Sequence, residues 1–236
     1  MNKTVLSLKN VHTYIGRHHI LQGVNLDIKE GRPTVLLGRN GAGKSSTLRA
    51  VMGLNPIFKG EIKFNNQYIH DKKPYDIARM GIGFVAEEKA IFSTLKVEEN
   101  LKVSALGQDE NFQERVENIF DLFPDLKKFW RKKAGLLSGG QKQMLAISRA
   151  LVNDHKMILI DEPSKGLAPI VVDQLAQSLI RIRRKTTIIL VEQNFYLAGL
   201  IGVDYFILDD GITVHQGRME DLKQDEDLKK KYLGIG

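Results

Sequence analysis

The sequence predicts an α/β fold: a mostly parallel sheet forms the core, an antiparallel β layer precedes it, and a helical subdomain is inserted into it. Three observations support this. Short apolar segments alternate with helical patterns, the N-terminal segments alternate apolar with polar residues, and a long internal stretch is helical throughout. A chain of 236 residues is long enough for one sizeable domain with such an insertion. We assign residues 1–87 and 154–236 to the core with its β layer, and 88–153 to the helical subdomain.

The core is predicted from apolar runs separated by helix-forming stretches. Such runs are typical of strands that are buried on both faces of a parallel sheet. The strand-like segments are Thr34–Leu37, Ile82–Val85, Met157–Ile160 and Thr187–Val191, and the helix-like segments are Ser45–Met52 and Ile170–Arg184. This order indicates parallel strands joined by crossover helices.

The β layer is predicted from a period of two. Apolar and polar residues alternate over 24–28, and parts of the segment 5–11 do the same. Alternation of this kind is typical of half-buried strands in an antiparallel sheet.

The helical subdomain is predicted from the stretch 88–153, where no convincing strand intervenes. Phe112, Val116, Ile119, Phe120 and Phe123 recur at helical spacing. We interpret these residues as core packing of a helix rather than as a ligand-binding cluster.

Composition narrows the classes of function without choosing one. The chain has no cysteine, which excludes disulfides and thiolate metal sites. Its net charge of +7 favours anionic partners such as nucleotides, nucleic acid or anionic lipid. The N-terminus lacks a secretory signal pattern, and the apolar runs are too short to cross a membrane. We therefore expect a cytoplasmic or peripheral protein.

The first chemical motif follows the strand-like run that ends at Leu37. Residues 38–45 fit G-x-x-x-x-G-K-[ST] between a strand and a helix, the context that a phosphate-binding P-loop requires. Glycines let the backbone N–H groups turn inward around phosphates, and the following helix adds the positive end of its dipole. Lys44 is expected to neutralise the β- and γ-phosphates of ATP, and Ser45 to bind Mg²⁺. The candidate ATP-binding residues are Gly38, Arg39, Asn40, Gly41, Ala42, Gly43, Lys44, Ser45 and Ser46.

The second motif is an apolar run, Met157–Ile160, that ends in two acids. Parallel sheets bind ligands at the carboxyl ends of their strands. We expect Asp161 to hold the Mg²⁺ shell and Glu162 to polarise an attacking water. Successive strand residues point in opposite directions, so adjacent acids can have separate roles.

The third motif, Leu137–Gln141, reads LSGGQ and opens a helix-compatible stretch. Taken with the other two motifs, it makes the chain resemble the ATP-hydrolysing subunits of ABC transporters along essentially its whole length. The resemblance implies a P-loop NTPase core and a dimer in which Ser138, Gly139, Gly140 and Gln141 close over the ATP of a second subunit. A second anion site at a helix N-terminus agrees with that arrangement.

Other roles come from the same resemblance. Tyr14 corresponds to the aromatic residue that stacks on adenine, and Glu87 and Gln193 occupy the positions of a Mg²⁺- and water-sensing glutamine and a switch histidine. The resemblance also implies membrane permease partners, a homodimer or a heterodimer with a related ATPase, and indirect coupling to an extracytoplasmic substrate-binding protein. It places the chain at the cytoplasmic face of the membrane.

Within the family the chain looks most like the ATPases of branched-chain amino acid importers. The segments 95–101 (LKVEENL), 162–169 (EPSKGLAP) and 191–194 (VEQN) carry that likeness, whereas residues 86–90 read AEEKA where the subgroup usually has PEGRR. Related importers carry urea or short amides, and these substrates are alternatives that the sequence leaves undecided. A soluble ABC ATPase acting on nucleic acid is a further alternative, but such proteins typically have two cassettes or coiled-coil arms, so no nucleic-acid partner is expected. A P-loop kinase leaves the LSGGQ segment unexplained.

Overall fold

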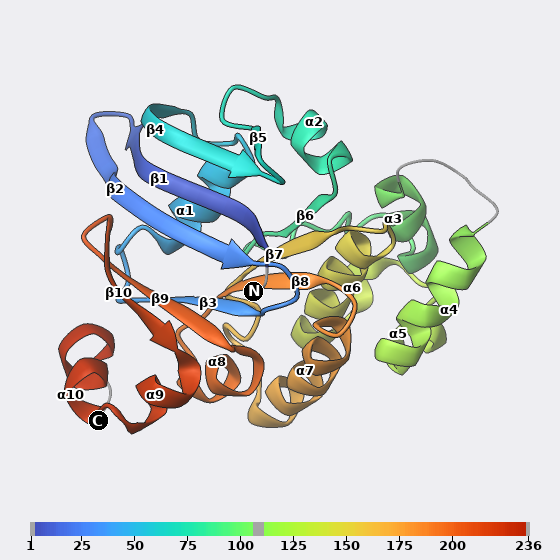
Figure 1. Cartoon of the computed structure of the whole chain (residues 1–236). Helices are drawn as coiled ribbons and strands as arrows, with labels where there is room; N and C mark the ends of the chain where they lie inside the picture. Colours follow the sequence, from blue (N-terminus) through green and yellow to red (C-terminus); the bar gives the residue numbers. More distant parts are fainter. Residues whose placement is uncertain (1–2, 106–110, 235–236) are drawn as a thin grey trace.

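The computed structural model describes residues 3–105 and 111–234, whose strands form two sheets (Figure 1). The smaller sheet has the strand order β2-β1-β4-β5, and the larger has the order β10-β9-β3-β8-β7-β6. The strands are β1 (Thr4–Ile15), β2 (His18–Lys29), β3 (Thr34–Leu37), β4 (Ile57–Phe64), β5 (Gln67–Tyr68), β6 (Ile82–Val85), β7 (Met157–Asp161), β8 (Thr187–Val191), β9 (Asp204–Asp209) and β10 (Ile212–Arg218).

The helices connect and cover these strands. They are α1 (Lys44–Val51), α2 (Pro74–Arg79), α3 (Val97–Ser104), α4 (Phe112–Leu122), α5 (Pro124–Lys128), the 3₁₀ segment η1 (Ala134–Leu136), α6 (Gly139–Leu151), α7 (Pro169–Ile182), α8 (Phe195–Ile201), α9 (Met219–Gln224), α10 (Glu226–Leu228) and the π-helical segment η2 (Lys229–Leu233).

The larger sheet confirms the predicted α/β core. β3, β6, β7, β8 and β9 pair in parallel, and only the edge strand β10 is antiparallel to its neighbour. All residues of β3, β7 and β8 are buried, which explains their continuous apolar runs.

The predicted antiparallel β layer is the smaller sheet. β1 pairs with β2 and β4 in antiparallel registers that are interrupted by bulges. Its inner face carries Leu6, Leu8, Leu26 and Ile28, which are buried, while Lys9, Asn25 and Asp27 between or beside them are exposed.

Each face of the larger sheet packs on a separate hydrophobic cluster. Leu36, Leu159 and Ile189 face α1 and the smaller sheet, and Val35 and Ile158 face α6, α7 and α8. Helix α1 therefore lies between the two sheets (Figure 1). This arrangement fixes the start of α1 against the carboxyl ends of β3 and β7.

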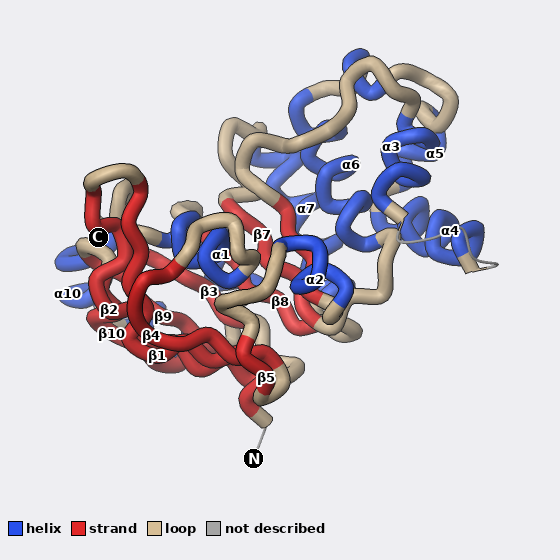
Figure 2. The backbone as a smooth tube through the Cα atoms, turned by 90° about the horizontal axis from the view of Figure 1, so that it is seen from above, coloured by secondary structure: helices blue, strands red, loops and turns tan. Residues whose placement is uncertain are grey.

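Helices α3, α4 and α5 gather at one end of the molecule, away from the smaller sheet (Figure 2). Val116, Ile119 and Phe120 of α4 are buried, as the helical spacing predicts. Residues 106–110 of the predicted helical subdomain lie outside the described residues. The division of the chain at residues 88 and 153 stays a prediction.

None of the helices in the described part of the chain has the length and the apolar character that a membrane crossing needs.

Candidate functional site

The predicted phosphate-binding segment, residues 38–46 and called the phosphate loop below, joins β3 to α1 and includes the first turn of that helix, as the motif predicts. Gly38 has φ +139°, and a Cβ atom there would lie 2.2 Å from the carbonyl oxygen of Leu208. Gly43 has φ +96° and packs against Leu21 of β2. Both positions therefore require glycine for backbone conformation and for space.

The first three residues of the predicted loop, Gly38, Arg39 and Asn40, form one wall of a cavity of about 380 Å³ beside the end of β8. Arg39, Asn40 and Gly41 are exposed, Ala42 is buried, and Ser46 is half-buried in the first turn of α1. The cavity is lined by Leu37, Gly38, Arg39, Asn40, Glu192, Gln193, Phe195 and Leu233.

Lys44 is the buried cation of this loop. Its side chain is 4% exposed, and Nζ donates hydrogen bonds to the carbonyl oxygens of Gly38 (2.9 Å) and Arg39 (3.0 Å). Burial lowers the pKa of Lys44, and the nearby carboxylates, Glu162 and Asp161 foremost, oppose that shift. The loop thus holds a preorganised positive charge at the helix N-terminus, the position at which an anion binds.

The first two motifs meet at Ser45 and Asp161, which are 116 residues apart in the sequence. Ser45 Oγ donates a hydrogen bond of 2.9 Å to Asp161 Oδ1. Burial raises the pKa of Asp161 to about 6, the bond from Ser45 opposes the shift, and the carboxylates of Glu162 and Glu87 add to it. Asp161 is therefore a buried carboxylate whose charged form is disfavoured overall, although the Lys44 ammonium and the Arg49 guanidinium lie close enough to stabilise it in part.

These two oxygens fit a Mg²⁺ ion. Mg²⁺ prefers hard oxygen ligands and usually takes only one or two from the protein, the remainder coming from phosphates and water. The described residues contain no cluster of three or more His, Cys, Asp or Glu side chains arranged for a metal. An incoming cation would also relieve the unfavourable burial of Asp161.

The raised pKa of Asp161 predicts a pH-dependent cost to folding. Between the unfolded value of about 3.9 and the folded value of about 6, the folded chain binds a proton that the unfolded chain has lost, so stability falls as the pH rises. We expect Asp161→Asn to gain stability relative to the parent by about 1 kcal/mol more at pH 8 than at pH 5.

Urea unfolding without nucleotide or Mg²⁺ measures this difference. Asp27→Asn, at an exposed position of β2, is the matched control and should show the same small difference at both pH values. A stability gain for Asp161→Asn that is equal at pH 5 and pH 8 would contradict the proposed burial cost.

Glu162 follows the end of β7 and is 9% exposed. Gln193 Nε2, after the end of β8, donates hydrogen bonds of 2.6 Å to Glu162 Oε1 and to Asn40 Oδ1 of the phosphate loop. Glu162 adopts φ +44°, a left-handed conformation that is uncommon for residues other than glycine. The structure thus joins Glu162, Gln193 and the phosphate loop in one network.

Glu87 lies beyond the end of β6 and is connected to Glu162 through Lys165, a residue to which the sequence analysis gave no role. Lys165 Nζ lies 2.5 Å from Glu87 Oε1 and 3.7 Å from Glu162 Oε2. The bond to Glu87 is the main cause of a raised pKa for Lys165. In this arrangement Lys165 screens two carboxylates from each other.

Glu192 is a second residue that the sequence analysis did not assign. It is 2% exposed, and its carboxylate accepts hydrogen bonds from Ser164 Oγ and from the backbone N–H groups of Ser164, Gln193 and Asn194. Burial raises its pKa despite these bonds. Glu192 thereby fixes the loop after Glu162 to the segment that carries Gln193, and its position directly after a buried strand was the available signal.

The LSGGQ segment lies at the N-terminus of α6. Ser138 and Gln141 form a reciprocal capping box, with Gln141 N donating to Ser138 Oγ (3.3 Å) and Ser138 N donating to Gln141 Oε1 (3.0 Å). Gly139 is open, whereas a Cβ atom on Gly140 would lie 2.7 Å from Val171 Cγ1. Within the ranges that the structure describes, no hydrogen bond or ion pair joins residues 138–141 to the phosphate loop.

Tyr14 lies on β1 and is 47% exposed. Its ring stacks on His19 with centroids 4.6 Å apart and contacts Phe58 at 4.8 Å. The same sheet reaches the phosphate loop through the contact of Leu21 with Gly43. Tyr14 is thus part of an aromatic surface on the sheet that borders the loop.

Comparison with known proteins places these features in a family context. Residues 21–165 match the family model described as ABC transporter. The chain is 36% identical over 232 residues to the high-affinity branched-chain amino acid transport ATP-binding protein BraG of Pseudomonas aeruginosa, covering 98% of this chain and 100% of that protein. It is also 36% identical to the probable branched-chain amino acid transport ATP-binding protein LivF of Archaeoglobus fulgidus, covering 92% of this chain and 93% of that protein.

Solved structures share the fold. A nucleotide-free ATP-binding cassette from an ABC transporter superposes with a TM-score of 0.86 at 23% identity, over 99% of this chain and 100% of that chain. The cassette MJ0796, solved as a dimer in a post-hydrolysis state bound to ADP and Pi, superposes with a TM-score of 0.80 at 28% identity, over 91% of this chain and 98% of that chain.

Proposed function

The chain belongs to the ABC transporter family as an ATP-hydrolysing subunit, and from that premise we propose that it powers the import of branched-chain amino acids through separate membrane permeases. The hydrogen bond between Ser45 and Asp161 carries the ATPase part, because it joins the phosphate loop to the carboxylate expected at the metal. Two relatives of 36% identity that are named for branched-chain amino acid transport support the substrate.

ATP binding is proposed to rest on the loop 38–46. Its backbone N–H groups surround the β- and γ-phosphates, and Lys44 exchanges its carbonyl partners for phosphate oxygens. Ser45 and Asp161 would hold Mg²⁺, and Glu87 would be the third residue to contribute to its site. The ion, when bound, neutralises charge that develops on the transferred phosphoryl group.

Hydrolysis is proposed to use Glu162 as the base that accepts a proton from the attacking water. The Gln193 side chain orients the Glu162 carboxylate by a hydrogen bond to its Oε1. A second hydrogen bond, to Asn40 Oδ1, connects Gln193 to the phosphate loop. Unlike an imidazolium, the Gln193 amide donates hydrogen bonds without adding charge. In this structure Lys165 pairs with Glu87 and Glu162. Both carboxylates have a proposed role in the site with ATP bound, so Lys165 would have to release at least one of them when ATP binds.

A second subunit is proposed to complete the site. Residues 138–141 start a helix whose N-terminus can bind an anion, and Ser138 and Gly139 there are exposed. As far as the described residues extend, no hydrogen bond or ion pair joins this segment to the phosphate loop of its own chain. Two chains arranged head to tail bring each terminus to the other chain's γ-phosphate, with Tyr14 stacked on adenine. The partner is a second copy or a related ATPase, and the pair works at the cytoplasmic face of the membrane beneath its permeases.

Leucine uptake by cells that lack this gene tests the proposal. The parent chain should restore uptake that depends on an extracytoplasmic binding protein, whereas Glu162→Gln should not. Glu220→Gln, an exposed position in α9, is the matched control and should restore uptake fully. If the chain instead restores uptake of urea or a short amide and leaves leucine uptake absent, the proposed substrate is wrong.

A further inference from the structure

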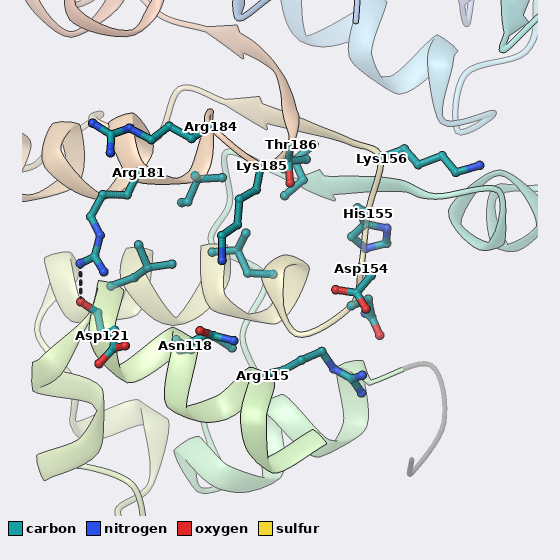
Figure 3. Close-up of a pocket in the computed structure, with 16 residues that line it drawn as sticks. Arg115, Asn118, Asp121, Asp154, His155, Lys156, Arg181, Arg184, Lys185 and Thr186 are labelled. Carbon is teal, nitrogen blue, oxygen red and sulfur yellow. Dashed lines mark hydrogen bonds between the residues drawn. The ribbon is translucent and has the colours of Figure 1, made fainter. Parts of the chain in front are cut away.

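A second cavity, of about 600 Å³, lies where β7 and β8 begin, at the end of the sheet opposite to Asp161 and Gln193. Its walls come from α4, the end of α6, the end of α7 and the connections that lead into the two strands (Figure 3). It shares no lining residue with the cavity beside the phosphate loop. Its volume is in the range of small-molecule sites.

The floor of this cavity is apolar. Ile119 of α4, Ile158 of β7 and Ile182 of α7 line it, and each is at most 5% exposed. Leu122 and Leu151 extend the apolar surface. A ligand that covers this floor must therefore carry an apolar body.

The rim of the cavity is strongly basic. Five cationic residues line it against two acidic ones, Asp121 and Asp154. The cationic residues are Arg115, Lys156, Arg181, Arg184 and Lys185. Burial lowers the pKa of His155, which therefore contributes a neutral ring.

Four of these cations, all except Arg115, form no ion pair with a carboxylate of residues 3–105 or 111–234. Arg181 is held in place instead by its Nη1, which donates a hydrogen bond of 2.6 Å to the main-chain oxygen of Asp121. In Figure 3, Lys185 extends from the α7–β8 connection towards Asn118 on α4, whereas Arg184 and Lys156 point away from the middle of the cavity. The positive charge available to a ligand is thus centred on Lys185 and Arg181.

We propose that this cavity binds a small organic anion that carries one carboxylate or phosphate group on a compact apolar body. Lys185 supplies the counter-charge, and the Asn118 amide donates a hydrogen bond to the same acidic group. The three isoleucines hold the body. An inorganic anion leaves the floor uncovered, and a neutral apolar molecule removes water from Lys185 without replacing its hydrogen bonds.

Calorimetric titration of the full chain tests this proposal with four probes: hexanoate, hexyl phosphate, inorganic phosphate and hexan-1-ol. Saturating Mg-ADP is present throughout, so that the phosphate loop is already occupied. We expect at least one of the two amphiphilic anions to bind, and inorganic phosphate and hexan-1-ol to bind at least about tenfold more weakly.

Substitutions locate the binding site. Lys185→Gln removes an exposed charge and should lower the affinity for the anionic probe about tenfold. Asn118→Ala should lower this affinity less. Lys3→Gln, which replaces an exposed lysine at the start of the chain, should leave the affinity unchanged. Thermal unfolding of each variant reports whether the fold is kept.

The outcomes are separate from those of the proposed ATPase. Tighter binding of hexanoate assigns the cavity to carboxylates, and tighter binding of hexyl phosphate assigns it to phosphate esters. Equal affinity for Lys185→Gln and the parent, or for hexan-1-ol and the anions, overturns the proposal. Failure of ADP to bind counts against the proposed ATPase. The comparison of probe affinity between the parent and Lys185→Gln still tests whether this cavity binds the anion.

Discussion

Replacing Lys44 by alanine is expected to weaken Mg-ATP binding by on the order of a hundredfold or more, which abolishes it at ordinary protein concentrations. Lys44 is the buried cation of the phosphate loop, and its ammonium group is already positioned by two carbonyl oxygens. The variant loses charge-assisted hydrogen bonds to two phosphates at once. Isothermal titration calorimetry measures the loss directly.

Two further variants make this result specific. Lys44→Met keeps the buried stem of the side chain and removes only the charge, so it should lose ATP affinity to a similar degree. Lys72→Ala removes an exposed lysine elsewhere and should bind ATP like the parent. Parental ATP affinity in both Lys44 variants would remove the loop from the proposed site.

Glu162→Gln is expected to retain ATP, to reduce hydrolysis at least about a hundredfold and to accumulate an ATP-bound dimer. The amide still accepts the hydrogen bond from Gln193, and Lys44, Ser45 and Asp161 are untouched. What is lost is the ability to take a proton from water. Phosphate-release assays and size-exclusion chromatography with Mg-ATP measure the two effects.

A variant of Glu87 tests whether a second carboxylate can act as the base for ATP hydrolysis. Lys165 holds Glu87 close to Glu162, so residual hydrolysis could pass through that carboxylate. Glu87→Gln combined with Glu162→Gln should then remove the residual rate. A parental rate in Glu162→Gln removes this residue from its role as base. A chain that stays monomeric with saturating Mg-ATP contradicts self-association, and mixing with a related ATPase then tests the heterodimer.

The core of the fold was predictable because its strands are buried on both faces. β3, β6 and β8 occupy the predicted residues, and β7 extends one residue further, to Asp161. Helix α7 begins at Pro169, one residue before the predicted start, because proline suits the first turn of a helix. β4, β9 and β10 were not predicted. The edge strand β10 has no fully buried residue and therefore no apolar period, whereas β9 is buried from Tyr205 to Leu208 and its apolar run was overlooked.

The site was predictable where its residues are contiguous and not where distant side chains meet. The motif spacing places Gly38 in a loop and Lys44 and Ser45 in the first helical turn directly after it, and a strand end carries Asp161 and Glu162. The bond between Lys165 and Glu87 spans 78 residues, and the bonds of Glu192 to Ser164 span 28. No local pattern encodes such pairs, because they depend on which strands become neighbours in the sheet.

The left-handed backbone at Glu162 sets stability and activity against each other. A residue with a Cβ atom costs about 1 kcal/mol or more in this conformation, whereas glycine adopts it freely. Glycine at position 162 would therefore relax the chain and at the same time delete the proposed base. A screen by melting temperature rewards relief of this backbone strain and does not detect loss of the base, so a library screened in that way should be counter-screened for ATP turnover at this position.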